Sequence, residues 1–162
     1  MIKIIKVEKK KDRKEFINFP LRMYKDNPNF VPPLYADEKK MFTKKFAYND
    51  TCESAFFLAE KDGETVGRIS AIIQKAANKK NDEKRVRFTR FDCIDDEEVA
   101  KALFGAVENY ALKNGMDTVC GPLGYSDLER EGLLIEGFNE LSTFEEQYNA
   151  EYYGKLIEAC GY

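Results

Sequence analysis

The stretch FLAEKDGETVGRI, residues 57–69, decides the fold of this chain. It opens on an apolar run and then reaches Asp62-Gly63, a pair that is typical of a two-residue hairpin turn. Small or apolar residues follow at alternate positions on one face: Gly67, Ile69, Ala71 and Ile73. We therefore predict two antiparallel strands, over Ser54–Glu60 and Thr65–Gln74, joined by a tight turn.

Elements on either side extend this hairpin into a sheet. Ile2–Val7 alternates apolar and basic residues, and Val86–Ile94 is rich in strand-forming residues, so both are predicted to be strands. Asp95–Asn114 is predicted to be a long helix, because acidic residues suit its N-terminus and apolar residues recur at helical spacing. Gly115 is expected to end that helix in a left-handed conformation.

The remaining segments are less regular. The expected elements are a helix over Lys11–Tyr24 interrupted at Pro20, a short helix over Lys39–Phe46, a solvated loop over Lys75–Lys84, a strand over Asp117–Cys120, an irregular loop over Ser126–Phe138 and a last helix capped by Asn149. A helix and strand order of this kind predicts an α/β protein.

Composition limits the possible functions. The chain has 162 residues, 43% of them hydrophobic and 34% charged, which fits a single globular domain with a core of its own. The net charge of −3 disfavours nucleic acid as a partner. No apolar run approaches the ~18–20 residues that a membrane span needs, and the N-terminus is too short and charged for a signal peptide. We therefore expect a cytoplasmic protein that has no membrane partner.

The chain contains no histidine and four cysteines. Serine–histidine and cysteine–histidine catalysis are thereby excluded, and no metal site is expected, because no two cysteines form a CxxC pair. Cys93 and Cys120 could act as nucleophiles, but no histidine is present to activate them, so inert thiols are the favoured interpretation. Any catalysis must use carboxylates, tyrosine, lysine, cysteine, backbone amides or water.

The order of elements and several strings resemble the GNAT superfamily of acyl-CoA N-acyltransferases. Residues 57–69 resemble its second and third strands, and residues 149–162 resemble its fourth helix. The strings Val31–Leu34, Gly121-Pro122 and Gly132–Phe138 resemble the N-terminal half of larger bacterial GNAT-like proteins. The resemblance implies a mixed, mostly antiparallel sheet flanked by helices. Residues 1–162 would form a single GNAT-like domain that lacks the last C-terminal strands.

The resemblance also implies a reaction and its residues. A GNAT enzyme moves an acyl group from acetyl-CoA or another acyl-CoA directly to an amine, here a small molecule or a peptide, and needs a base and an acid. Asp92 matches the acidic base, and Tyr153 or Tyr152 the tyrosine acid, although Ile157 occupies the usual tyrosine position. The alternatives are a solvated loop acid or a helix-end acid for Asp92, and aromatic core packing for both tyrosines.

Coenzyme A would be held by the loop before the long helix, where backbone N–H groups bind its diphosphate. The matching residues are Cys93, Ile94, Asp95 and Asp96. This loop has no glycine, and residues 92–98 carry five carboxylates, so a capping acid is expected to take the N–H groups that the phosphates need. A second hypothesis follows: a non-catalytic GNAT-like module that pairs with a second GNAT-like domain, or with a copy of itself as a homodimer.

Two polar segments are candidates for binding. Arg85, Arg87 and Arg90 lie in a basic stretch that could contact phosphates, and an ordinary solvated hairpin is the alternative. Residues 126–131 include Glu129 and Arg130 in a long polar loop. Loops on a rigid sheet carry function disproportionately, so this loop could line an acceptor pocket or be plain surface.

Overall fold

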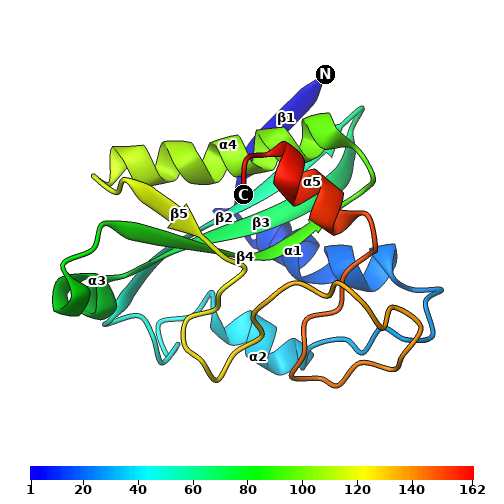
Figure 1. The fold of residues 1–162 in the computed structure, drawn as a ribbon, viewed down its shortest axis with the longest axis horizontal. Helices are drawn as coiled ribbons and strands as arrows, with labels where there is room; N and C mark the ends of the chain where they lie inside the picture. Colours follow the sequence, from blue (N-terminus) through cyan, green and yellow to red (C-terminus); the bar gives the residue numbers. More distant parts are fainter.

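The computed structural model describes residues 1–162 as one five-stranded sheet with helices on both faces (Figure 1). The strands lie in sequence order: β1 (Ile2–Lys6), β2 (Cys52–Lys61), β3 (Glu64–Gln74), β4 (Arg85–Cys93) and β5 (Thr118–Cys120). β1 to β4 pair antiparallel, and β5 pairs parallel with β4. The helices are α1 (Lys10–Met23), α2 (Tyr35–Lys40), α3 (Lys75–Asn81), α4 (Glu97–Lys113) and α5 (Tyr153–Ala159). The predicted mixed, mostly antiparallel α/β architecture is confirmed.

The central hairpin forms as predicted. Asp62 and Gly63 both have positive φ, 54° and 85°, and Lys61 pairs with Glu64 across the turn. Aspartate tolerates this left-handed conformation and glycine adopts it freely, which is why the pair suits a tight turn.

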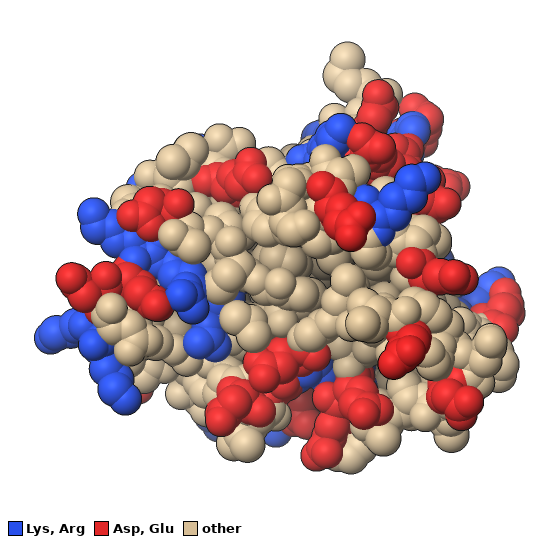
Figure 2. All heavy atoms as spheres, viewed as in Figure 1, with Lys and Arg blue, Asp and Glu red and all other residues tan.

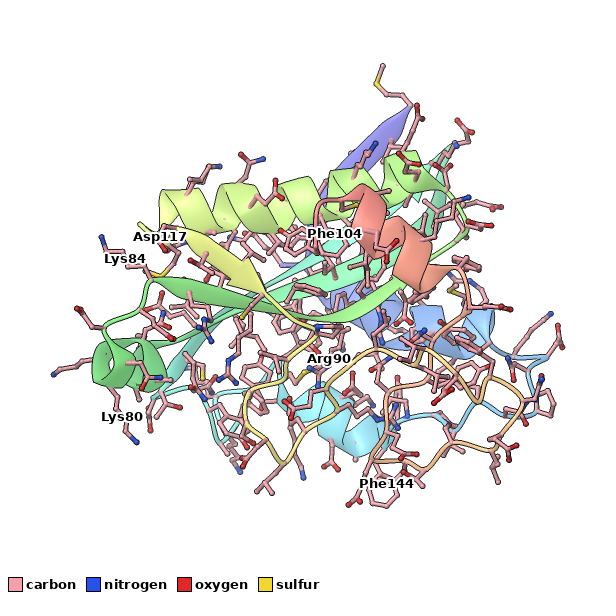
Figure 3. The ribbon with its side chains drawn as sticks, in the orientation of Figure 1. Lys80, Lys84, Arg90, Phe104, Asp117 and Phe144 are labelled. Carbon is pink, nitrogen blue, oxygen red and sulfur yellow. The ribbon has the colours of Figure 1, made fainter.

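Two apolar layers form on opposite faces of the sheet. Phe57 and Ala59 of β2 belong to the larger layer, which is covered by α4 and α5. Their neighbours Phe56 and Leu58 point to the other face and pack with Phe16 of α1 in a smaller layer. In Figure 3, Phe104 of α4 lies on the first side of the sheet and Arg90 of β4 on the second. The first face is therefore apolar core, whereas the second also holds charged groups.

A β-bulge in β4 decides which residues face the second side. Arg68 pairs with Asp92 and Ser70 with Thr89, so β4 holds one more residue than β3 between these pairs. Arg90 lies in the bulge with φ of 51°. As a result the adjacent Thr89 and Arg90 both border the same cavity as Asp92, which strict alternation would prevent.

Three local predictions were wrong. The expected loop at Lys75–Lys84 contains α3, whose lysine, alanine and asparagine residues form a short helix that ends on Asp82 in the left-handed conformation. The short helix expected over Lys39–Phe46 lies earlier, as α2. Asn149 does not cap α5, because its side chain bonds the backbone N–H and carbonyl of Leu134 instead.

The interruption expected at Pro20 was also wrong: α1 continues past Pro20 as one helix, because the Pro20 carbonyl still accepts from the Tyr24 N–H at 2.9 Å. The predicted long helix forms as α4, capped by Asp96. No helix of the structure combines the length and apolarity needed to cross a membrane.

Gly67 tests the packing of α4 on the sheet. A Cβ at this position would lie 2.8 Å from Leu103 Cδ1 and 3.1 Å from the Asp92 carbonyl oxygen. We expect Gly67→Ala to lower the free energy of unfolding by about 1–3 kcal/mol, because both neighbours are fixed in the core. Gly105→Ala is the matched control: its Cβ meets nothing within 4 Å, and alanine should stabilise α4 by up to about 1 kcal/mol. Urea unfolding measures both, and an unchanged Gly67→Ala would contradict this packing.

Candidate active site and its cavity

A buried ion pair joins β3 to β4. Arg68 Nε donates to Asp92 Oδ2 at 2.7 Å, and the two residues are only 5% and 1% exposed. The guanidinium also donates to the Phe16 carbonyl oxygen at 2.8 Å and lies over the Phe16 ring. A buried charge needs a partner and further hydrogen bonds, and both are present. Asp92 is therefore not the solvated loop acid that the sequence left open as an alternative.

Two tyrosines complete the environment of Asp92. Tyr24 OH donates to Tyr153 OH at 2.7 Å, and the Cys93 N–H donates to the same oxygen at 2.9 Å. The Tyr153 proton is then directed to Asp92 Oδ1, 3.3 Å away. Burial raises the pKa of Tyr153, and the Asp92 charge raises it further, so the phenol stays protonated at neutral pH. A protonated phenol that borders a carboxylate can pass protons in either direction.

Tyr152 binds the same residue, Cys93, through its other backbone group. Its OH donates to the Cys93 carbonyl oxygen at 2.7 Å, while Tyr153 accepts from the Cys93 N–H. Burial raises the pKa of Tyr152 as well. The adjacent tyrosines at the start of α5 thus bind both backbone groups of Cys93 at the end of β4, and only Tyr153 also contacts Asp92.

The loop from β4 to α4 uses its own acid as a cap. Asp96 accepts from the N–H groups of Glu98 at 3.0 Å and Val99 at 3.3 Å, and pairs with Lys61 Nζ at 2.7 Å. The hydrogen bond from Lys61 lowers the pKa of Asp96, so this cap remains charged at neutral pH. Of the other predicted cofactor residues, Ile94 and Asp95 are exposed at the surface of the loop.

Cys93 is buried at the end of β4. Burial raises the pKa of its thiol, and the nearby Asp96 and Asp92 carboxylates add to this effect. The thiol is therefore protonated at neutral pH. This agrees with the favoured interpretation of Cys93 as an inert residue rather than a nucleophile.

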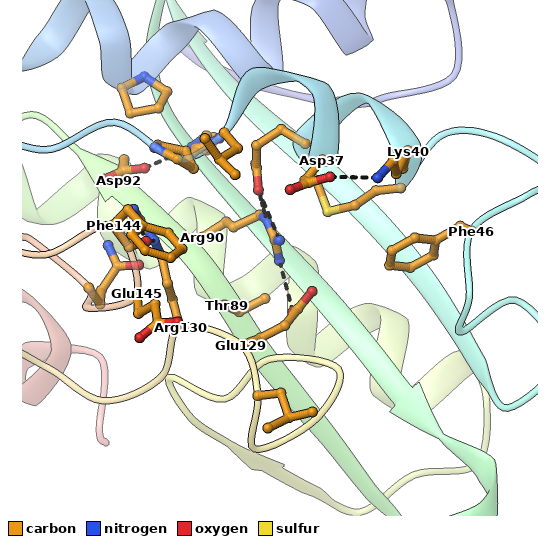
Figure 4. A pocket seen from close by; sticks show the side chains of 18 of the residues that line it. Asp37, Lys40, Phe46, Thr89, Arg90, Asp92, Glu129, Arg130, Phe144 and Glu145 are labelled. Carbon is orange, nitrogen blue, oxygen red and sulfur yellow. Dashed lines mark hydrogen bonds and ion pairs between the residues drawn. The ribbon is translucent and has the colours of Figure 1, made fainter.

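A cavity of about 550 Å³ lies on the α1 and α2 side of the sheet (Figure 4). Asp92 borders it from β4. Arg90 also lines it and binds Glu38 of α2 through two nitrogens, at 3.2 and 3.1 Å, with Glu129 at 3.8 Å. The Glu38–Arg90 pair joins segments 52 residues apart and is largely buried. Glu38 was not among the residues predicted from the sequence, because nothing in its spacing points to the sheet.

Arg130 enters the cavity from the long loop that follows β5. Its guanidinium donates to the Phe144 carbonyl oxygen, with Nε at 2.7 Å, and to the Val31 carbonyl oxygen at 3.3 Å. No carboxylate lies within 4.0 Å of it, unlike Arg68 and Arg90. Burial lowers the pKa of Arg130, as does the positive charge of Arg90 nearby. Glu129 and Arg130 thus line a pocket, one of the two outcomes considered for their loop.

The molecular surface is charged unevenly. In Figure 2, lysine and arginine gather at the left, where Figure 1 places α3, and acidic side chains dominate the lower right, over the long loop. A nucleic-acid site needs a continuous basic face. The face seen in Figure 2 instead divides between the two signs.

Curated proteins of known sequence include two clear relatives, although no family model matches the chain. Protein YghO of Escherichia coli is 34% identical over 153 residues, which cover 94% of this chain and 39% of that protein. The bacterial ceramide synthase of Caulobacter vibrioides is 30% identical over 163 residues, which cover 99% of this chain and 42% of that protein. The chain therefore spans about two fifths of the length of these relatives.

Solved structures identify the fold. A tandem GNAT protein from the clavulanic acid biosynthesis pathway superposes with a TM-score of 0.63 and 12% identity, over 99% of this chain and 43% of that one. Glucosamine-6-phosphate N-acetyltransferase from Arabidopsis thaliana superposes with a TM-score of 0.56 and 15% identity, over 100% and 91%. The fold is that of the GNAT acetyltransferases. The resemblance seen in the sequence is thereby confirmed for the fold.

This GNAT fold has an acidic cap at the N-terminus of α4. A GNAT domain that holds coenzyme A in the usual way needs the backbone N–H groups at the N-terminus of α4, and Asp96 occupies two of them. The residues there do not fit a diphosphate, because a carboxylate already takes its place and its donors. At the end of β4, by contrast, Asp92 and Tyr153 are in direct hydrogen-bond contact.

The Glu38–Arg90 ion pair makes the stability of the fold depend on pH. Burial raises the pKa of Glu38, but the Arg90 guanidinium outweighs burial and holds that pKa below its usual value. Its contribution to stability is therefore present above the unfolded pKa of about 4.3 and is lost as pH falls through the lower folded value. We expect Glu38→Gln to cost up to about 3–5 kcal/mol at neutral pH, since Arg90 then keeps only its longer contact with Glu129, and the deficit to shrink below about pH 4.

Urea unfolding between about pH 7 and pH 3 measures this deficit. Glu97→Gln is the control, because Glu97 pairs with Lys101 in an exposed position and should change little. A deficit for Glu38→Gln that is constant over the whole range would contradict the ion pair.

Proposed function

We propose that this chain is the GNAT domain of an N-acyltransferase, which takes an acyl group from an acyl-CoA and transfers it to an amine bound in the cavity. One observation carries the proposal: Asp92 borders the cavity and also contacts Tyr153 at the end of β4. The amine site and the proton-transferring groups are thus continuous. The acetyltransferases that share the fold support acyl transfer as the reaction class.

The proposed chemistry needs two proton movements. Acyl-CoA supplies an acyl carbon activated by a thioester. As the amine nitrogen bonds to that carbon and the carbon–sulfur bond breaks, Asp92 accepts the amine proton and Tyr153 donates its own proton to the sulfur. The Asp92–Tyr153 hydrogen bond, 3.3 Å long, then returns the proton from the carboxyl to the phenol. Arg68 keeps Asp92 in place as a carboxylate between turnovers.

Tyr153→Phe tests the role of the phenol. We expect turnover of acyl-CoA and a panel of primary amines to fall by about a hundredfold or more, because the acid is lost while the aromatic ring remains. Mass spectrometry of the amide product is the suitable readout, since the four free cysteines interfere with thiol reagents. Tyr152→Phe is the matched control and should lose far less, because Tyr152 does not touch Asp92. Equal losses in both variants would show that Tyr153 only packs.

A second function is favoured by the cap of α4: a GNAT-like module without activity of its own, which pairs with a second GNAT-like domain or protomer. Residues 1–162 would then be one domain of a larger assembly. The Asp96 carboxylate supports it, because it blocks the diphosphate position.

The variant Asp96→Gly distinguishes between the two proposed functions. Glycine is tolerated as a helix cap, so the fold should survive, while two N–H groups and Lys61 become free. We expect the affinity for acetyl-CoA, measured by calorimetry, to rise about fivefold or more. Glu97→Gln removes the same charge without freeing an N–H group and should have a smaller effect. If neither the native chain nor Asp96→Gly binds at millimolar ligand, the non-catalytic module is the better description.

A further inference from the structure

Exposed apolar side chains gather at the mouth of the cavity. Leu34, Leu128 and Phe144 line it and are 59%, 90% and 53% exposed. They come from three separate segments: the residue before α2 and two distant parts of the long loop. We call these three side chains the apolar rim. Six other large apolar residues are exposed, but none of them lines this cavity, so the three rim residues are what makes its opening apolar.

The interior of the cavity has the opposite character. Its walls carry the Arg68–Asp92 and Glu38–Arg90 pairs and the Arg130 guanidinium, which bonds only backbone carbonyls. Charged and polar walls need a polar occupant. A ligand that satisfies both regions has a compact polar head and an extended apolar part.

We propose that the cavity binds the polar head of a single-chain amphiphile while the apolar rim holds its alkyl chain. This inference deepens the proposed function: the acceptor is a long-chain primary amine, with the amine beside Asp92 and a polar oxygen of the head near Arg130. The volume of about 550 Å³ lies within the range of small-molecule sites, about 300–1,000 Å³. A protein partner seated on the rim would instead cover the cavity without placing a polar group beside Arg130, which has no carboxylate partner.

Chain length is the direct test. We expect calorimetry, with each amine below its micelle concentration, to show dodecylamine binding at least about a hundredfold more tightly than butylamine. Each methylene buried on the rim adds up to about fourfold in affinity. The double variant Leu128→Ser, Phe144→Ser should lose about tenfold for dodecylamine and little for butylamine. The matched control is Leu112→Ser, a residue 72% exposed on α4 across the sheet, which should change neither.

Three results would overturn the proposal: equal affinity for both amines, equal losses in the double variant and in Leu112→Ser, or binding to phosphatidylcholine vesicles without binding of the dissolved amine. A change of molar mass in light scattering, caused by the double variant alone, would assign the rim to a protein interface and overturn it too. Binding is measured without acyl-CoA or turnover. Failure of acyl transfer in the presence of normal dodecylamine binding would therefore reject the proposed function and keep the ligand class.

Discussion

The buried Arg68–Asp92 ion pair is the interaction on which the candidate site depends. Taking two charges out of water costs several kcal/mol for each ion, and their attraction offsets this only with good geometry and further hydrogen bonds. Here the charges and their hydrogen-bond partners come from four elements of the fold. β3 and β4 supply the two charges, α1 supplies the Phe16 carbonyl, and Tyr153 of α5 donates to the carboxylate. The ion pair therefore forms with its full set of hydrogen bonds only when β3, β4, α1 and α5 are all in their native positions.

The two faces of the sheet differ in character. The α4 side is filled with apolar residues and leaves no room even for a methyl group at Gly67. On the other side the β4 bulge turns Arg90 toward α2, where Glu38 binds it. A bulge of this kind changes the alternation of a strand at low cost. The bulge allows charged residues to form a cavity wall on a sheet whose other face is apolar.

The sequence predicted features set by neighbouring residues well, and features set by residues far apart in the chain poorly. The hairpin and α4 were predictable, because Asp62-Gly63, alternation and an acidic cap are local signals. Asp92 and Tyr153 were selected through a family resemblance. Their actual partners were not, since the contact of Tyr24 with Tyr153 joins residues 129 apart and follows only from the final packing.

The missed features have physical reasons as well. α3 has no buried residue, so it lacks the apolar stripe by which a helix is recognised. Asn149 is followed by a helix and resembles a cap, but its amide bonds the Leu134 backbone of the long loop. The second error arises because a tertiary contact overrides a local preference.

The two ends of the candidate site differ in how completely the chain satisfies its own charges. At the N-terminus of α4, Asp96 accepts from two N–H groups and pairs with Lys61, so these donors are already used within the chain. In the cavity, Arg130 has only carbonyl partners, and apolar side chains stand exposed around the opening. Unsatisfied groups are where binding free energy is available. On the proposed function, the specificity of this chain therefore resides in the acceptor, and the donor end depends on how readily Asp96 yields its position.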